Sequence, residues 1–186
     1  MIRAALVASL AALPAAAQTL PDRDAARALL FEADGSEIVV IAHDFLSELD
    51  IETLGQMPQV AQLKYYGALA AAPALGLQAE ASRGAFNYHS PERARAGALA
   101  ECDAVRGGGP ACVIVAEIRP RGWQDGRALT LSQDATEAVT TRAFRRAGPS
   151  PVLAISPSTG AWGLGDGAAA AVAACGQADC APAVAE

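Results

Sequence analysis

Four cysteines limit what this chain can fold into more than any other feature of its sequence. They are Cys102, Cys112, Cys175 and Cys180, an even number that allows three disulfide pairings. In an exported protein, the oxidising compartment converts such cysteines into disulfides. A zinc site with four cysteine ligands is the alternative, but nine and four intervening residues do not match the tight pairs typical of structural zinc sites. We therefore expect two disulfides and no bound metal.

The first 17 residues are typical of a secretory signal peptide. Arg3 supplies a positive start, and a short apolar run from Ala4 to Leu13 ends at Pro14. Three alanines then provide the small residues that a signal peptidase recognises. Because the cleavage site has no cysteine, we expect no lipid anchor there. A buried first helix is the alternative interpretation. We expect cleavage after Ala17 and a periplasmic or secreted protein.

The charge of the mature chain narrows the choice of partners. After cleavage, 13 basic and 20 acidic residues remain, a net charge of −7. This acidity argues against nucleic acid or an anionic membrane as the main partner. The apolar run near the N-terminus is too short to span a bilayer, so we expect no stable membrane insertion. Aromatic residues make up only 5% of the chain, so the core should have few large anchors.

Residues 18–62 are predicted to form an N-terminal helix–strand–helix segment. Acidic residues followed by apolar residues at helical spacing predict a helix over 21–33. The β-branched run over 37–42 predicts a strand. A second and weaker helix is predicted over 50–63, with an interruption at Pro58.

Residues 63–186 are predicted to form two related halves, each with the order strand, strand, helix, strand. The first half has strands predicted over 64–73 and 75–81, a helix that Ser90 caps, and a strand over 111–118. The second half has a short strand predicted at 128–131, a helix that Ser132 caps, a strand over 152–157 and an alanine-rich helix. The fold class expected from this order is α/β (α+β), in one compact sheet-and-helix domain.

The two halves also share short sequence patterns. The matching residues are Gly84-Ala85-Phe86 with Gly160-Ala161-Trp162, and Ala94, Ala98 and Cys102 with Gly167, Ala171 and Cys175. In each half one cysteine ends a helix and a second one opens the next strand. An internal duplication of this kind places the same local link in both halves. It favours the pairs Cys102–Cys112 and Cys175–Cys180 over the other connectivities.

This twice-used pattern of Gly-Ala-aromatic, Ala-x-x-x-Ala-x-x-x-Cys helix and nearby second cysteine resembles a family of small secreted bacterial repeat proteins of unknown function. The resemblance covers about residues 63–186 and implies local disulfides and no catalytic residues. The chain lacks the family's terminal third cysteine in each copy, and it has an additional N-terminal segment.

The stretches "QLKYYGALAAAP" and "LAISPSTGAWG" are also similar to alphaproteobacterial proteins sometimes labelled 5-aminolevulinate synthase. Such a synthase needs pyridoxal phosphate on a Schiff-base lysine. The chain has a single lysine, Lys64, and is much shorter than a two-domain cofactor enzyme. We therefore expect no activity of this kind.

A glycine-rich stretch near the C-terminus has the spacing of a permissive dinucleotide fingerprint. Gly163, Gly165 and Ala168 follow a predicted strand and precede a predicted helix, as that motif requires. The corresponding fold needs further βαβ units and an acid about 20 residues on, whereas only 18 residues follow Ala168. We therefore expect no cofactor, and interpret these glycines as the shortened turn of the second half.

Only two histidines are present, and each has a polar neighbour. His43 and Asp44 follow a predicted strand, and His89 and Ser90 stand at a strand-to-helix junction. If the four converged, they could supply the base, orienting group and nucleophile of a small hydrolase. The alternative is structural, with Asp44 ending a strand and Ser90 capping a helix. The strained Gly-x-Ser-x-Gly elbow of many hydrolases is absent from the sequence.

Two further features have a structural and a binding interpretation. Arg142, Arg145 and Arg146 cluster near the end of a predicted helix, where they can complement the helix dipole or hold an anion. Trp123 lies in a polar loop between the halves, where it can pack over the sheet or offer a contact surface.

The function that these patterns favour is a non-enzymatic binding or interaction module in the periplasm. Its expected partner is an unknown periplasmic or envelope protein, and no nucleic acid. The alternative is a small periplasmic hydrolase that uses His43, Asp44, His89 and Ser90.

Overall fold

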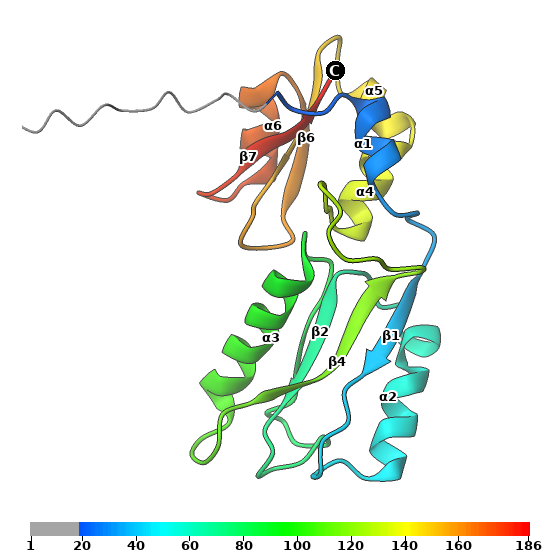
Figure 1. Cartoon of the computed structure of the whole chain (residues 1–186). Coiled ribbons are helices and arrows are strands. Elements are labelled where there is room, and N and C mark those ends of the chain that lie inside the picture. Colours follow the sequence, from blue (N-terminus) through cyan, green and yellow to red (C-terminus); the bar gives the residue numbers. More distant parts are fainter. Residues whose placement is uncertain (1–18) are drawn as a thin grey trace, which may run out of the picture.

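The structure is a computed structural model that describes residues 19–186 (Figure 1). The expected signal peptide and its cleavage after Ala17 lie outside the described residues. The chain has a mixed α and β fold with two sheets, one in each of two lobes. The first lobe contains β1, α2, β2, β3, α3 and β4, and the second contains α1, α4, α5, β5, β6, α6 and β7.

The first lobe has helices on both faces of an antiparallel four-stranded sheet of order β1-β4-β2-β3. Its elements are β1 (Ser36–Val40), α2 (Glu48–Ala61), β2 (Gly67–Ala71), β3 (Arg83–Ala85), α3 (Pro91–Val105) and β4 (Val113–Pro120). Ala68 and Ala70 of β2 pack on the α3 side, whereas Ala71 packs on the α2 side with Leu54. This alternation follows from the two-residue period of a strand.

The second lobe repeats this layering around a three-stranded antiparallel sheet of order β6-β5-β7. Its elements are α1 (Arg23–Leu29), α4 (Gln133–Thr140), α5 (Arg142–Arg146), β5 (Pro151–Ile155), β6 (Trp162–Asp166), α6 (Ala168–Cys175) and β7 (Ala181–Ala185). Leu153 of β5 packs with Val139 and Phe144 of the helices on one face. Ala154 packs with Ala171 of α6 on the other face.

The two β-β-α-β units have the same strand arrangement. In each, the first strand lies between the second and the last, as β3-β2-β4 and as β6-β5-β7. Each central strand also has a register shift against the last strand, at Leu69/Ala70 and at Leu153/Ala154. If the two units are aligned on these register shifts, Leu69 corresponds to Leu153. Leu69 pairs with Gly84 and Leu153 pairs with Leu164, so Gly84 corresponds to Leu164 and not to Gly160.

Both predicted disulfides are confirmed. Cys102 at the end of α3 is bonded to Cys112 just before β4, and Cys175 at the end of α6 to Cys180 just before β7. Residues 19–186 contain no free cysteine. Each bond closes the short connection between a helix and the strand that follows it.

Side-chain caps begin α1 to α5, and two of these caps, at Ser90 and Ser132, were predicted. The hydroxyls of Ser90 and Ser132 accept hydrogen bonds from the main-chain N–H groups of Arg93 and Ala135, at 3.3 Å each. Ser47 and Asp50 form a reciprocal capping box at the start of α2. These caps satisfy main-chain N–H groups that have no partner inside a helix.

Four local predictions were wrong. Helix α2 continues past Pro58 to Ala61 without interruption. Residues 75–81 form turns, with a positive φ of 81° at Gly76, and the second strand comes later as β3. Residues 128–131 form no strand, because the side chains of Leu129 and Leu131 pack into the second core without a neighbouring strand to pair with.

The fourth wrong prediction concerns the glycine-rich stretch. Gly163 and Gly165 lie within β6 and form no turn. A Cβ atom at Gly163 would overlap the main chain at Cys175, and one at Gly165 would overlap the main-chain nitrogen of Ala171. The glycines therefore let α6 approach the sheet closely, which is a packing role and not a phosphate-binding one.

The N-terminal segment contributes to both lobes. The guanidinium of Arg23 donates hydrogen bonds to the carbonyl oxygens of Val139, Thr140 and Thr141, at 2.9, 2.8 and 3.1 Å. These carbonyls end α4, where a cation is favourable. Strand β1 pairs with β4 in the first lobe. No helix in residues 19–186 has the length and apolar character needed to cross a membrane.

Candidate functional site

His89 joins the two lobes through both of its ring nitrogens. Nδ1 accepts a hydrogen bond from the N–H of Ser132 at 3.0 Å, and Nε2 lies 2.9 Å from the carbonyl oxygen of Ala161. Since a main-chain N–H only donates and a carbonyl only accepts, the ring is neutral with its proton on Nε2. Burial lowers the pKa of His89 and opposes its charged form. No lone pair remains for a proton-abstracting role.

The other candidate hydrolase residues do not meet His89. His43 donates from Nε2 to the carbonyl oxygen of Ile114 at 2.8 Å, and its ring stacks on Phe45. The Ser90 hydroxyl caps α3, and Asp44 is exposed. No hydrogen bond between described residues links the four candidate side chains to one another. His43 and Asp44, and likewise His89 and Ser90, are neighbours only because they are consecutive in the chain.

A polar cluster around Asp134 completes the joint between the lobes. The Asp134 carboxylate accepts hydrogen bonds from Lys64 Nζ at 2.8 Å and from Asn87 Nδ2 at 3.1 Å. The N–H of Asp134 donates in return to Asn87 Oδ1 at 3.2 Å. The single lysine of the chain is therefore a structural ion-pair partner. Burial raises the pKa of nearby Tyr65 to about 12, so its hydroxyl stays protonated and donates to the carbonyl of Glu32.

Trp123 and the arginine cluster have different environments. Trp123 packs with its ring centroid 5.2 Å from those of Phe31 and Tyr66, so it is a packing residue. The side chains of Arg142, Arg145 and Arg146 are exposed around α5, and the last two lie in its final turn. That position agrees with the helix-dipole interpretation.

The charge of the protein is concentrated in one segment. Residues 19–186 contain 20 acidic and 13 basic residues. Residues 28–63 contain seven of the acids and no lysine or arginine, which leaves 13 acids and 13 bases elsewhere. The seven acids are Glu32, Asp34, Glu37, Asp44, Glu48, Asp50 and Glu52. The whole net charge of −7 therefore belongs to the segment that forms β1 and α2.

These seven carboxylates have no ion-pair partner in the described part of the chain, although Arg119 of β4 stands opposite Glu37 in the sheet. None forms an ion pair within 4.0 Å, and all but the half-buried Asp50 are exposed. Glu48 and Asp50 have an internal use, since acids in the first turn of a helix complement its dipole. Hydrogen bonds from the Ser47 side chain and main chain lower the pKa of Asp50. The acids before α2 have no such use.

Apolar side chains are exposed beside these acids. The exposed fractions are 36% for Val39, 71% for Leu49 and 36% for Ile51. Val39 lies on β1, and the other two lie in the first turns of α2, which packs against β1. We call the outer edge of β1 together with the exposed side chains of Glu37, Val39, Glu48, Leu49, Ile51 and Glu52 the β1–α2 surface. Exposed apolar side chains with polar residues around them are a common feature of protein-binding surfaces.

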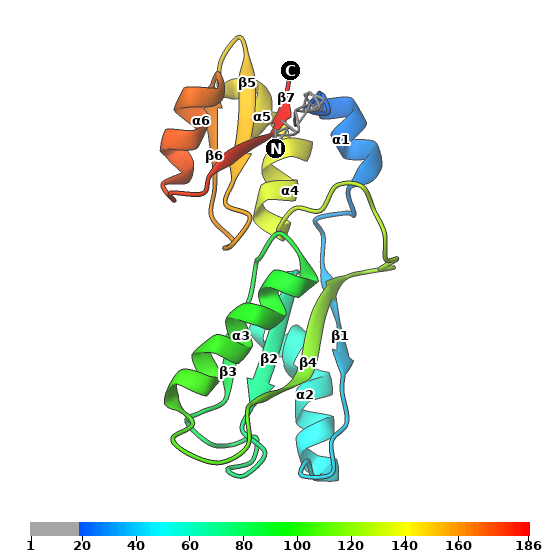
Figure 2. The same ribbon diagram turned by 60° about the vertical axis from the view of Figure 1, so that its left-hand side comes forward.

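Strand β1 is an open edge of the first sheet. Figure 2 shows it as the outermost strand, with α2 behind the sheet. The N–H of Ile41 donates to the carbonyl of Val115 at 2.8 Å, and hydrogen-bonded pairs alternate along an antiparallel ladder. By this alternation and the register of β1 with β4, the main-chain groups of Ser36, Ile38 and Val40 point outward. No main-chain group of the described residues bonds to them.

Of the three other edge strands, β3, β6 and β7, two are protected in ways that β1 is not. Strand β3 has only three residues. Strand β7 contains Pro182, and its Ala185 N–H donates to the carbonyl of Pro21 at 3.1 Å. Short length, proline and a covering segment are the usual protections of an edge. The β1 sequence Ser-Glu-Ile-Val-Val has none of them and favours strand pairing.

The face of β1 that carries Val39 adjoins a buried carboxylate. Val39 stands opposite Glu117 in β4. Glu117 accepts hydrogen bonds from Arg95 at 2.6 Å and from Arg119 at 2.6 and 2.9 Å. Burial opposes its ionisation, but these hydrogen bonds outweigh burial and keep the pKa of Glu117 below its usual value. This acid is fully used inside the fold and is not a free ligand group.

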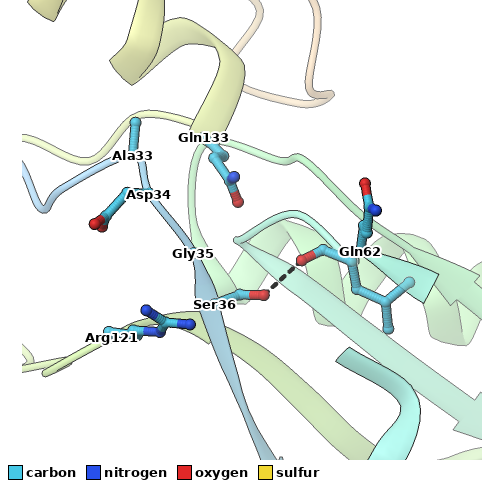
Figure 3. Close-up of a pocket in the computed structure, with 8 residues that line it drawn as sticks. Ala33, Asp34, Gly35, Ser36, Gln62, Arg121 and Gln133 are labelled. Carbon is cyan, nitrogen blue, oxygen red and sulfur yellow. Dashed lines mark hydrogen bonds between the residues drawn. The ribbon is translucent and has the colours of Figure 1, made fainter. Parts of the chain in front are cut away.

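A pocket of about 340 Å³ lies at the start of β1 (Figure 3). Asp34, Gly35 and Ser36 line one side of it, and residues 62–63 after α2 line another. The Ser36 hydroxyl donates to the carbonyl of Leu63 at 2.5 Å. The pocket is open, and its charged lining residues are Asp34 and Arg121. It adjoins the β1 edge on the side of the joint between the lobes, with one charge of each sign.

No known protein supplies an interpretation of this surface. Comparison with family models, with curated proteins and with solved structures gives no match. In residues 19–186, no three or more histidine, cysteine, aspartate or glutamate side chains are placed to hold a metal ion. Charge counted segment by segment would have located the β1–α2 surface from the sequence, whereas its open edge requires the strand order.

Proposed function

We propose that this chain is an exported protein that works by binding another protein through the β1–α2 surface. The observation that carries the proposal is that the whole net charge of residues 19–186 lies in the segment forming that surface, beside exposed Val39, Leu49 and Ile51. Charge that served only solubility would not need to collect in one segment. Unpaired charge of one sign beside apolar side chains favours a partner of opposite charge.

Export to the periplasm or outside the cell is part of the same proposal. Two disulfides support it, because such bonds persist in oxidising compartments. An origin of the two β-β-α-β units by duplication, as in the family of secreted repeat proteins that the chain resembles, is supported by their common strand order and local disulfide. The β1–α2 surface lies outside the residues that this resemblance covers, so it is the feature particular to this chain.

Site-directed photo-crosslinking in cells that naturally make the protein tests the proposal. A photoreactive phenylalanine is placed at Leu49, and the matched control carries it at Val105 on α3, which is 50% exposed. We expect a discrete protein adduct from position 49 and none from position 105. Adducts of equal yield at both positions, or no adduct at 49, would refute protein binding through this surface.

A further inference from the structure

We infer that the partner binds as an extended, cationic polypeptide segment that adds a strand to the open edge of β1. This inference rests on the proposed function and specifies the partner's chemistry at the same surface. Strand addition uses unpaired main-chain groups at a sheet edge for affinity and alternate side chains for specificity. The edge of β1 offers the outward main-chain groups of Ser36, Ile38 and Val40.

The charge of the surface decides between a second copy of this chain and a different partner. Pairing β1 with β1 of a second copy would bring two segments together that each carry seven acids and no base. Like charges at that range oppose association. A segment rich in lysine or arginine instead places its cations near Glu37 on β1 and Asp34 in the adjoining pocket. The occupant is therefore a basic segment of another protein.

The side of α2 that lies next to the β1 edge indicates which residues the bound segment carries on its second face, and these residues are apolar. Asp50 lies near Gln78 of the β2–β3 connection, 3.5 Å away, and Leu54 faces the core. At 100° per residue, Ile51 lies on the opposite side of Leu54 from Asp50. That direction is away from β2 and β3 and towards the free edge of β1. Ile51 therefore flanks the position of an added strand.

Gly55 lies one turn after Ile51 on this same side of α2. A Cβ atom there would meet no atom within 4 Å, so nothing inside the protein requires glycine. Glycine in a helix interior is otherwise unfavourable. An added strand that approaches α2 closely accounts for it. The segment that fits alternates basic side chains, facing Glu37, with apolar side chains, facing Ile51 and Gly55.

A decapeptide of alternating arginine and valine is the probe, titrated into the mature protein. Two further peptides carry N-methyl groups on all arginine or on all valine nitrogens, so that each has one strand edge blocked. We expect the parent to bind and one methylated peptide to bind at least about tenfold more weakly than the other. We also expect the parent to slow amide hydrogen exchange at Ser36, Ile38 and Val40. Equal binding of the methylated peptides, protection elsewhere, or no binding at about 1 mM overturns strand addition.

The outcomes separate this inference from the proposed function. If the methylated peptides bind equally but the in-cell adduct at position 49 forms, the protein binds its partner without strand addition. If no adduct forms at position 49, the proposed function fails whatever the peptides do.

Discussion

The Nε2–H group of His89 donates a hydrogen bond to the carbonyl oxygen of Ala161 at 2.9 Å, from the first lobe to the second. The other ring nitrogen accepts from Ser132, which begins α4. A protonated ring would place its second N–H against the N–H of Ser132. One neutral histidine thus connects the helix start and the hairpin of the second lobe to the start of α3.

This arrangement predicts that stability falls in mildly acidic solution. Because burial lowers the pKa of His89 in the folded protein, the unfolded chain binds the proton more strongly. The stabilisation is complete above the ordinary histidine pKa of about 6.5 and is lost as the pH falls below it. Urea unfolding between about pH 8 and pH 5 measures the slope. His89→Gln should lower the unfolding free energy at pH 8 by about 2 kcal/mol and flatten the slope.

The control is His43→Gln, which removes the only other histidine. The slope should persist in that variant. If the pH dependence of the unfolding free energy disappeared in His43→Gln and survived in His89→Gln, the hydrogen bonds of His89 between the lobes would not be the pH-sensitive element.

The close approach of α6 to β6 predicts a large cost for one added methyl group. Gly163→Ala should lower the unfolding free energy by about 2–3 kcal/mol, because its Cβ would overlap the main chain at Cys175. Gly108→Ala is the matched control, since a Cβ there meets no atom within 4 Å and its φ is not positive. Thermal unfolding of the two variants measures the difference in their stabilities. Similar stabilities would contradict a packing role for Gly163.

The two disulfides should contribute by similar amounts, because both close short loops. Their cysteines are separated by 10 and 5 positions. Chain-entropy estimates give about 3 kcal/mol for the longer loop and about 2 kcal/mol for the shorter. Paired replacements by alanine, Cys102→Ala with Cys112→Ala and Cys175→Ala with Cys180→Ala, can be compared by urea unfolding. A larger loss from the second pair would show that strain or packing outweighs loop entropy.

Gly55 predicts opposite effects on stability and on binding. Gly55→Gln should raise the unfolding free energy by about 0.5 kcal/mol, because glutamine is the better helix former and open space surrounds the site. The same change should weaken binding of the arginine–valine decapeptide at least about fivefold, since it fills the space of the added strand. Ala100→Gln on the exposed side of α3 is the control and should leave peptide binding unchanged. Normal binding of the peptide by Gly55→Gln would show that the added strand does not approach α2 at this glycine.

Local patterns were sufficient to predict much of the fold. The caps at Ser90 and Ser132 were readable because a hydroxyl before a helical stretch has a direct partner in the next turn. Near pairing of the cysteines was readable because each pair spans one helix–strand connection. The wrong strand over 75–81 contains apolar residues with suitable spacing, but Gly76 turns the chain there.

The sequence could not predict which distant segments of the chain lie in contact. Gly163 and Gly165 look the same in a phosphate-binding loop and in a strand against a helix, and only the position of α6 distinguishes them. His89 resembles a catalytic residue until its partners, Ser132 and Ala161, are seen to come from the other lobe. The open edge of β1 depends on the strand order, which no local pattern contains.

Two variants of equal charge, compared in the crosslinking experiment at Leu49, test directly whether the β1–α2 surface recognises a basic partner. The first carries Glu37→Lys and Glu52→Lys on the β1–α2 surface, and the second carries Glu101→Lys and Glu186→Lys, which are exposed elsewhere. We predict that the adduct at position 49 is lost in the first variant and kept in the second. An adduct that persists in both, or is lost from both, would contradict recognition of a basic partner by this surface.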